Sequence, residues 1–346
     1  MMTALQDIQA AAGATFVDGV AVSFGNEPVA IATARVALCD RTHWGRVQLT
    51  GADRVRFLHN QTTNDFQIRK PGQGCDTVFV TSTARTIDLA TAYIAEDAIL
   101  LLVSPGRRQQ LMQWMDRYIF PMDKVELHDI SDRTACFSTI GPESDALIEN
   151  ILGTKALIGQ ASHNHAIFPL ADLEVRVAVG SGLAMPGYTL IAPAAAAPKL
   201  WSKIVAAGAV PMGDRAWEQL RIQQGRPQPD RELTEDYNPL EAGLWQSISF
   251  EKGCYIGQET IARLNTYKGV KQRLWGISLQ GPAEPGTVIM VGEEKVGKLT
   301  SYAQTDRGDF GLGYIRTKAG GPGLQVQVGE TAGVVVDVSF LIHEYV

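Results

Sequence analysis

Two successive segments of the chain show the same order of predicted elements, and this repetition restricts the possible folds more than any other feature. In each segment a strand, a helix, three strands, a second helix and a final strand follow one another. The first set is predicted at residues 47–50, 52–60, 77–81, 87–94, 98–103, 107–118 and 125–128, and the second at 135–140, 142–152, 166–169, 173–179, 188–192, 194–207 and 210–212. Because several strands lie between two helices, the pattern predicts an α+β fold with antiparallel or mixed sheets rather than a doubly wound parallel sheet.

The amino-acid composition changes at Lys271, where glycines begin to alternate with short valine-rich segments. Residues 292–295 and 329–330 have the composition of hairpin turns, so a small antiparallel β-barrel or sandwich is expected here. A chain of 346 residues is too long for one ordinary core. We therefore expect an irregular N-terminal segment (1–48) that packs with the second half, a first α+β domain (49–130), a second (131–265) and a C-terminal β-barrel (270–346).

The segment with the most chemistry is residues 252–259, Lys-Gly-Cys-Tyr-Ile-Gly-Gln-Glu, hereafter the octapeptide. Gly253 and Gly257 allow close approach of the backbone to a ligand, and the cation of Lys252 could lower the pKa of the Cys254 thiol. The alternative is a tight structural turn with a buried cysteine, since free cysteine is commonly buried. The octapeptide lies just before the predicted junction with the β-rich C-terminal domain, and ligand sites often lie at domain junctions.

The octapeptide resembles the hallmark of the YgfZ family of folate-binding proteins, which are related to the T-protein (aminomethyltransferase) of the glycine cleavage system. Residues 238–244 (Asn-Pro-Leu-Glu-Ala-Gly-Leu), 220–225 and 57–65 match the family in the same order, and the branch indicated is the cyanobacterial and plastid one. The resemblance implies three domains in a ring around tetrahydrofolate or another reduced folate. It also implies a role in iron–sulfur cluster assembly or repair, which supports iron–sulfur enzymes such as those that modify tRNA.

The resemblance also implies the site residues. Cys254 is expected to be the catalytic residue, and no metal ligands are assigned. The expected folate-binding residues are Asp88, Tyr188, Arg221, Trp245, Lys252, Gly253, Tyr255, Gly257, Gln258 and Glu259. Two departures from the transfer enzymes weaken an aminomethyltransferase reading: residues 82–85 replace a Gly-Gly pair, and Thr189 stands where the enzymes carry a glutamate that grips the pterin. A neutral threonine cannot offer a bidentate carboxylate.

Composition separates the remaining alternatives. The net charge is −6 and no long basic run is present, which argues against a dedicated nucleic-acid binder. A folate-dependent aminomethyltransferase or methyltransferase is the main alternative, and a tRNA-binding module that uses the cations between Arg263 and Arg273 is the weakest. These cations and Lys252 could hold a folate glutamate tail or form a solvated face. No membrane segment or transit peptide is visible, so a cytoplasmic protein is expected, or a stromal one in a plant. Iron–sulfur client proteins or assembly factors are the expected partners.

Overall fold

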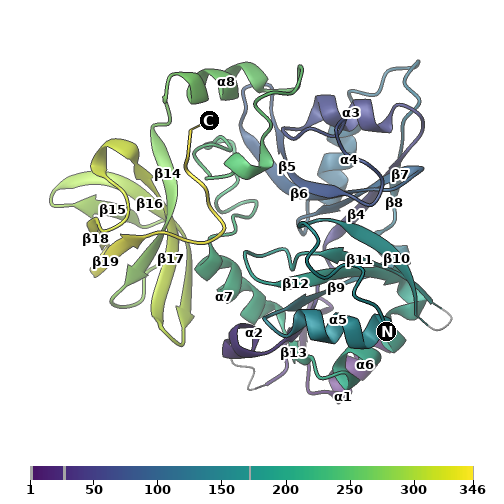
Figure 1. Ribbon diagram of the computed structural model, residues 1–346. Coiled ribbons are helices and arrows are strands. Elements are labelled where there is room, and N and C mark those ends of the chain that lie inside the picture. Colours follow the sequence, from purple (N-terminus) through teal and green to yellow (C-terminus); the bar gives the residue numbers. More distant parts are fainter. Residues whose placement is uncertain (1–2, 26–28, 171–172, 346) are drawn as a thin grey trace. The chain divides into compact units, whose positions relative to one another are not determined.

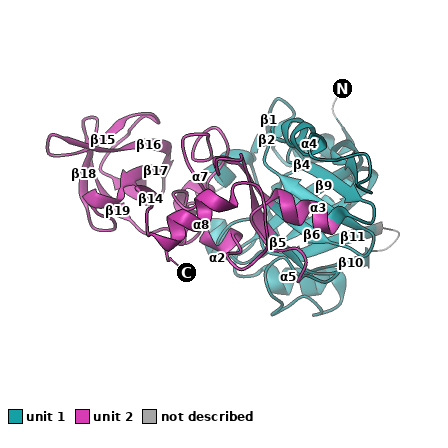
Figure 2. Ribbon diagram, turned by 90° about the horizontal axis from the view of Figure 1, so that it is seen from above, with its two compact units in different colours: residues 1–54, 69–75, 91–218 teal, residues 55–68, 76–90, 219–346 magenta. Residues whose placement is uncertain are grey.

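The computed structural model describes residues 3–25, 29–170 and 173–345, and it confirms the predicted fold class: two α+β halves and a closed C-terminal barrel. The chain divides into two compact units that interleave along the sequence (Figure 2). Unit 1 contains residues 1–54, 69–75 and 91–218, and unit 2 contains residues 55–68, 76–90 and 219–346.

The first half is a five-stranded sheet with the order β5-β6-β7-β4-β8. Its elements are β4 (Gly45–Thr50), α3 (Arg54–Gln61), β5 (Gly74–Val80), β6 (Thr86–Ile94), β7 (Ala98–Val103), α4 (Arg108–Asp116) and β8 (Glu126–Asp129). The pairings β6–β7, β7–β4 and β4–β8 are antiparallel. All six residues of β7 are buried, as a continuous apolar strand requires when both faces of its sheet are covered.

The second half is a six-stranded sheet with the order β10-β11-β12-β9-β3-β13, and it lies wholly in unit 1. Its elements are β3 (Ala37–Asp40), β9 (Thr134–Ile140), α5 (Ser144–Leu152), β10 (His165–Leu170), β11 (Leu173–Val179), β12 (Gly187–Pro193), α6 (Ala197–Ala206) and β13 (Val210–Met212). Side chains alternate along β12. Tyr188, Leu190 and Ala192 join a core cluster with α5 and α6, which cover one face of the sheet (Figure 1).

The N-terminal segment was expected to be irregular, and this expectation was wrong. It forms α1 (Ala4–Ala11), the hairpin β1 (Thr15–Val17) and β2 (Val20–Ser23), α2 (Ala30–Ala34) and β3. Thr3 and Gln6 form a capping box at the start of α1, a signal that the sequence carries and that composition alone obscures. Buried Leu5 belongs to the same core cluster as Trp201 of α6.

The C-terminal region of unit 2 is a closed antiparallel barrel with the order β14-β17-β16-β15-β18-β19. Its strands are β14 (Gln272–Leu279), β15 (Val288–Val291), β16 (Glu294–Thr305), β17 (Gly308–Arg316), β18 (Gln325–Val328) and β19 (Thr331–Val336). Both predicted hairpin turns join paired strands, β15 to β16 and β18 to β19. The barrel is filled by aliphatic side chains such as Ile277, Ile289 and Val335.

Helices α7 (Asp214–Gln224) and α8 (Gln258–Thr266) and the short 3₁₀ helix η3 (Trp245–Ser247) precede the barrel in the chain.

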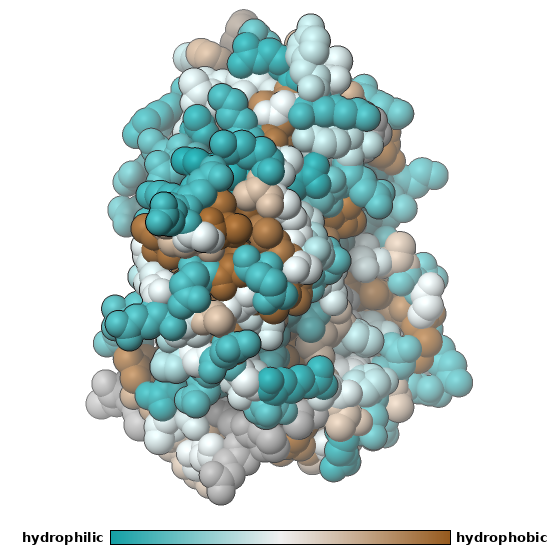
Figure 3. Space-filling model, turned by 90° about the vertical axis from the view of Figure 1, so that its left-hand side faces the viewer, coloured by the Kyte–Doolittle hydropathy of each residue, from teal (hydrophilic) through white to brown (hydrophobic). Residues whose placement is uncertain are grey.

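One face of the molecule carries a patch of hydrophobic side chains surrounded by hydrophilic ones (Figure 3). None of the helices in the described ranges has both the length and the hydrophobicity that a bilayer-spanning helix needs.

Candidate functional site

The octapeptide forms the turn that leads into α8, and its two glycines have different roles. Gly257 is the N-cap of α8, with a φ of 81° in the left-handed region. A Cβ atom at this position would lie 2.9 Å from the carbonyl oxygen of Thr81 and 3.0 Å from a methyl group of Val80. Gly253 has no heavy atom within 4 Å of the corresponding position. Gly257 is therefore needed for the turn itself, whereas Gly253 leaves open space beside Cys254.

Lys252 is buried and serves the end of helix α3. Its ammonium group donates hydrogen bonds to the carbonyl oxygens of Thr62 (2.8 Å) and Asn64 (2.7 Å), and a further one to that of His59. Carbonyl groups at a helix C-terminus lack partners within the helix and carry partial negative charge, so a cation is favourable there. A contact of Lys252 with folate stays a prediction, but its charge is already engaged within the protein.

Further bonds hold the octapeptide and the residues just before it to the segment at residues 57–65 within unit 2. The backbone N–H of Ile256 donates to the carbonyl of Asn60 (3.1 Å), and that of Ser249 donates to the carbonyl of Thr63 (3.0 Å). The hydroxyl of Thr63 donates to the carbonyl of Ser247 (2.7 Å). Two motifs that are almost 190 residues apart in the chain therefore form one local structure.

Cys254 is exposed, whereas Cys39, Cys75 and Cys136 are buried. Burial raises the pKa of the Cys136 thiol, which disfavours its thiolate. The alternative of a buried structural cysteine in the octapeptide is therefore excluded. Cys254 combines exposure with the open space at Gly253, so its thiol is accessible to a reagent or ligand.

The remaining side chains of the octapeptide differ in how far they are buried. Tyr255 is buried, its ring centroid lies 4.7 Å from the Lys252 ammonium, and burial raises its pKa. Gln258 is half-buried and Glu259 is exposed, both in the first turn of α8, where a negative charge is favourable. Of the expected basic cluster, Arg263, Lys268 and Lys271 are exposed and Arg273 is half-buried.

Trp245 lies in the core cluster that also contains Tyr255 and Ile261, with 4% of its surface exposed. Its buried indole N–H makes no hydrogen bond to any described residue. The guanidinium of Arg273 lies 5.9 Å from its ring centroid. The structure thus brings Trp245 to the octapeptide through the packing of Tyr255.

Asp88 lies on β6 within unit 2 and is 0% exposed. Its neighbour Leu89 packs in the same core cluster as Ile222, the residue after Arg221 on α7. The strand of Asp88 and the helix of Arg221 therefore share one core. An alternative for Asp88, a polar residue on the solvent-facing side of an alternating strand, is therefore excluded, because its side chain is buried.

Arg221 is buried in a network that sequence reasoning missed. Its guanidinium pairs with Glu232 at 3.0 Å and donates to the hydroxyl of Ser301 on β16 at 2.9 Å. Ser301 in turn donates to Glu232 at 2.6 Å, and Tyr314 of β17 donates to the Glu232 carbonyl at 2.8 Å. The network joins α7 to the barrel. No local sequence pattern around Glu232 or Ser301 predicts it. The carboxylate of Glu232 compensates for the free energy that burial of the Arg221 charge costs.

Tyr188 and Thr189 lie in unit 1. The Tyr188 hydroxyl donates to Asp145 of α5 at 2.6 Å, and the Thr189 hydroxyl donates to the carbonyl of Gly180 at 2.8 Å. A cleft shared by Tyr188 and Asp88 stays a prediction.

A second feature missed from the sequence is the buried Arg41, which is hydrogen bonded to the strand next to Thr189. Thr189 pairs with Ser138 on the adjacent strand β9, and the Arg41 guanidinium donates to the Ser138 hydroxyl at 3.1 Å. This guanidinium also lies 3.7 Å from the ring centroid of Trp44 and 4.5 Å from that of Trp217. Thr189, where the resemblance to the transfer enzymes predicts a glutamate, is therefore neutral, and its partner residue on β9 is hydrogen bonded to the Arg41 cation, which follows β3.

No group of three or more His, Cys, Asp or Glu side chains in the described ranges is arranged to hold a metal ion.

Comparison with known proteins places the chain in a family. The model of the GCVT N-terminal domain matches residues 16–252. A chloroplastic protein of Arabidopsis thaliana, whose name assigns it to the transferases, is 47% identical over 99% of this chain and 80% of its own length. An aminomethyltransferase of Halalkalibacterium halodurans is 29% identical over 85% of this chain and 82% of its own. The crystal structure of glycine cleavage system aminomethyltransferase T from Bartonella henselae superposes with a TM-score of 0.84, at 19% identity, over 99% of this chain and 98% of that one. The chain therefore belongs to the family defined by the GCVT N-terminal domain.

Proposed function

We propose that this protein is a YgfZ-type member of the family, which binds tetrahydrofolate or a related reduced folate and supports iron–sulfur cluster assembly or repair. The observation that carries the proposal is the local structure formed by the octapeptide and residues 57–65. It buries Lys252 and Tyr255 and leaves the thiol of Cys254 exposed. A fixed backbone with one exposed cysteine leaves this side chain accessible for a reaction or for transient ligation.

In this role Cys254 would contact an iron–sulfur cluster or iron as cargo, and the partners would be iron–sulfur client proteins or assembly factors. Clients include, on the resemblance, enzymes that modify tRNA. The relative named as chloroplastic supports a plastid setting for this branch of the family. Direct nucleic-acid binding is not proposed, because the net charge of −6 opposes it.

The residues around Thr189 bear on how a pterin would fit. A pterin amino group is a hydrogen-bond donor, and in the transfer enzymes a glutamate accepts from it. Here the Thr189 hydroxyl donates to Gly180, and the Arg41 cation is hydrogen bonded to Ser138, the partner of Thr189 on the neighbouring strand β9. Arginine is a donor only, so this corner of the chain does not fit the pterin grip of the enzymes. We infer weak or absent aminomethyl transfer, with Asp88, Arg221 and Trp245 retained as proposed folate contacts.

A folate-dependent aminomethyltransferase is the second candidate, and the names of relatives such as that of Halalkalibacterium halodurans favour it. The two functions differ in what they require of Cys254, which has no matching thiol in the transfer enzymes. Release of ammonia from an aminomethylated lipoyl carrier with tetrahydrofolate tests the transferase directly. Robust turnover by the wild type and by Cys254→Ser would favour the transferase over the cluster role.

Tetrahydrofolate binding is tested by quenching of tryptophan fluorescence, with the wild type compared with Asp88→Asn. This substitution keeps the volume and removes the charge. We expect saturable quenching by the wild type and affinity at least tenfold lower in the variant, since a charge-assisted hydrogen bond contributes about 1.5–3 kcal/mol. The cluster role is tested in cells that lack the protein, where Cys254→Ser should fail to restore client iron–sulfur enzymes. Absence of quenching would remove the folate proposal, and full rescue by the serine variant would remove the role of the thiol.

A further inference from the structure

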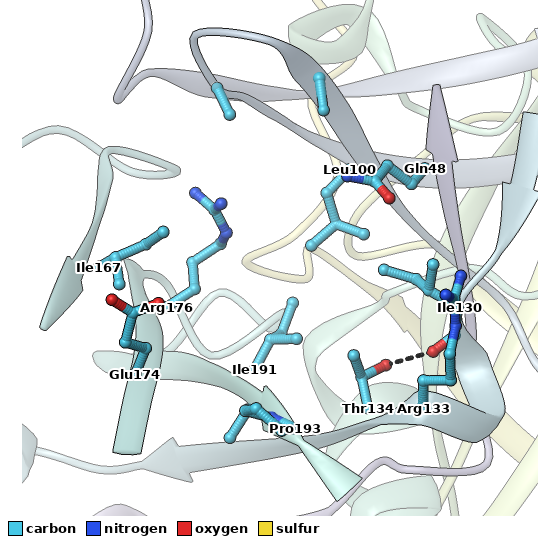
Figure 4. A pocket seen from close by; sticks show the side chains of 13 residues that line it. Gln48, Leu100, Ile130, Arg133, Thr134, Ile167, Glu174, Arg176, Ile191 and Pro193 are labelled. Atoms are coloured by element: carbon cyan, nitrogen blue, oxygen red, sulfur yellow. Dashed lines mark hydrogen bonds between the residues drawn. The ribbon is translucent and has the colours of Figure 1, made fainter. Parts of the chain in front are cut away.

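A separate pocket of about 250 Å³ lies within unit 1, where the two α+β halves contribute strands to the same unit (Figure 4). Leu100 of β7 and Ile191 of β12 form its apolar centre, with Ile130 and Pro193 beside them. Arg176 of β11 and Arg133 lie at opposite sides of these aliphatic groups in the close-up view (Figure 4). None of these residues belongs to the proposed folate or thiol site.

Arg176 is the most informative residue of the pocket. Its guanidinium is half-buried and hydrogen bonded to Nδ1 of His165 at 2.7 Å. Burial, and secondarily the neighbouring Arg176, lower the pKa of His165 to about 4, so the imidazole is neutral at pH 7 and Nδ1 accepts this bond. Burial lowers the pKa of the Arg176 guanidinium, and the neighbouring Tyr93 and Asp97 act against this shift. A partly desolvated cation beside apolar side chains is the usual arrangement for binding an anionic group.

The other charged groups limit the ligand. Arg133 supplies a second cation, and the exposed carboxylate of Glu174, two residues before Arg176 on the same face of β11, balances part of the positive charge. Local charge is therefore suited to one carboxylate rather than to a polyanion such as a phosphate chain. A volume of about 250 Å³ is below the roughly 300–1,000 Å³ typical of pockets for drug-sized ligands, so a whole folate is too large.

We propose that this pocket binds a small organic carboxylate with an apolar body, with the carboxylate at Arg176 and the body against Leu100 and Ile191. Binding of such a metabolite is independent of the proposed function, because the residues involved are separate. Burial of the apolar body against Leu100 and Ile191 stabilises the complex through the hydrophobic effect. The guanidinium of Arg176 orients the carboxylate of the ligand and favours a negative charge over a positive one.

The proposal is tested on the full chain by calorimetric titration with three probes. Phenylacetate has both features, acetate lacks the apolar body, and 2-phenylethylamine carries the opposite charge. We expect phenylacetate to bind at least tenfold more tightly than either of the others. No phenylacetate binding at millimolar concentration, or equal affinity for the amine, would overturn the proposal.

Variants locate the binding. Arg176→Gln should weaken phenylacetate binding about tenfold or more, and Arg117→Gln, at an exposed arginine at the end of α4, should have no effect. Ile167 lies at the pocket with 52% of its surface exposed, so it accepts a charge without loss of core packing. Ile167→Glu should abolish binding and Ile167→Lys should retain it. Binding unchanged in both Arg176→Gln and Ile167→Glu would place phenylacetate elsewhere and refute the assignment.

Discussion

Replacement of Lys252 by methionine tests whether the octapeptide acts as a structural connector. Methionine keeps a long flexible side chain of similar volume and removes the ammonium group. The three carbonyl oxygens that this ammonium contacts, those of His59, Thr62 and Asn64, would each lose this hydrogen bond. We expect strong destabilisation of unit 2 without a change in its fold.

The magnitude follows from the contacts. A buried acceptor left without a hydrogen bond costs about 1–3 kcal/mol, and three are affected. Part of this is offset because the variant no longer desolvates an ammonium ion. The net loss should be about 3–5 kcal/mol, as for breaking other buried charge contacts, and the Tm should fall by about 10 °C.

Urea unfolding followed by tryptophan fluorescence measures this loss, because Trp245 lies in the core cluster of the octapeptide. Lys295→Met is the matched control, because Lys295 is exposed in the barrel, and it should change the free energy of unfolding by less than about 0.5 kcal/mol. If Lys252→Met unfolds at the same urea concentration as the control, the three hydrogen bonds contribute no net stability and the connector role is refuted.

Three further predictions concern single residues. Gly257→Ala should cost about 2–3 kcal/mol in unfolding free energy, from the positive φ and the 2.9 Å approach to Thr81; Gly253→Ala, where space is open, is the control, and equal effects would contradict the reading. Iodoacetamide should modify Cys254 at least tenfold faster than the three buried cysteines, as peptide mass spectrometry after timed quenching would show; similar rates at all four would refute it. Because burial depresses the pKa of His165 from 6.5 to about 4 in the folded state, the unfolded chain takes up a proton first as the pH falls. Stability should thus drop between pH 6.5 and pH 4 by about 3 kcal/mol from this residue, and urea unfolding of His165→Asn should show a smaller drop over that range.

Local sequence patterns predicted most helices and strands, because the hydrophobic pattern and the turn residues that determine them lie within the element itself or next to it. The predicted strands at 98–103, 173–179 and 210–212 coincide with β7, β11 and β13, since each is an apolar or alternating run bounded by turn residues. The turns at 292–295 and 329–330 were found by composition in the same way. The helix α1 was missed because alanine-rich composition masked its Thr3 capping box.

The site was less predictable, because its contacts join residues far apart in the chain. The acceptors of Lys252 lie 188 to 193 residues earlier, and they are main-chain carbonyls, which every residue possesses. Arg221 and Glu232 are both hydrogen bonded to Ser301, which lies on β16, a different element. Arg41 beside Thr189 depends on the register of β9 and β12. No side-chain pattern in one segment encodes any of these partnerships.

The structural and chemical interpretations of the octapeptide turn out to apply to different residues of it. Lys252, Tyr255 and Gly257 face the protein and fix the turn against α3 and the β5–β6 connection, whereas Cys254 is exposed beside the open space at Gly253. Loss of function through Lys252 or Gly257 would therefore accompany loss of stability. A change at Cys254 should leave stability intact, because an exposed thiol contributes little packing. An effect of Cys254→Ser on client enzymes, at unchanged unfolding free energy, would thus report on the chemistry of the thiol itself.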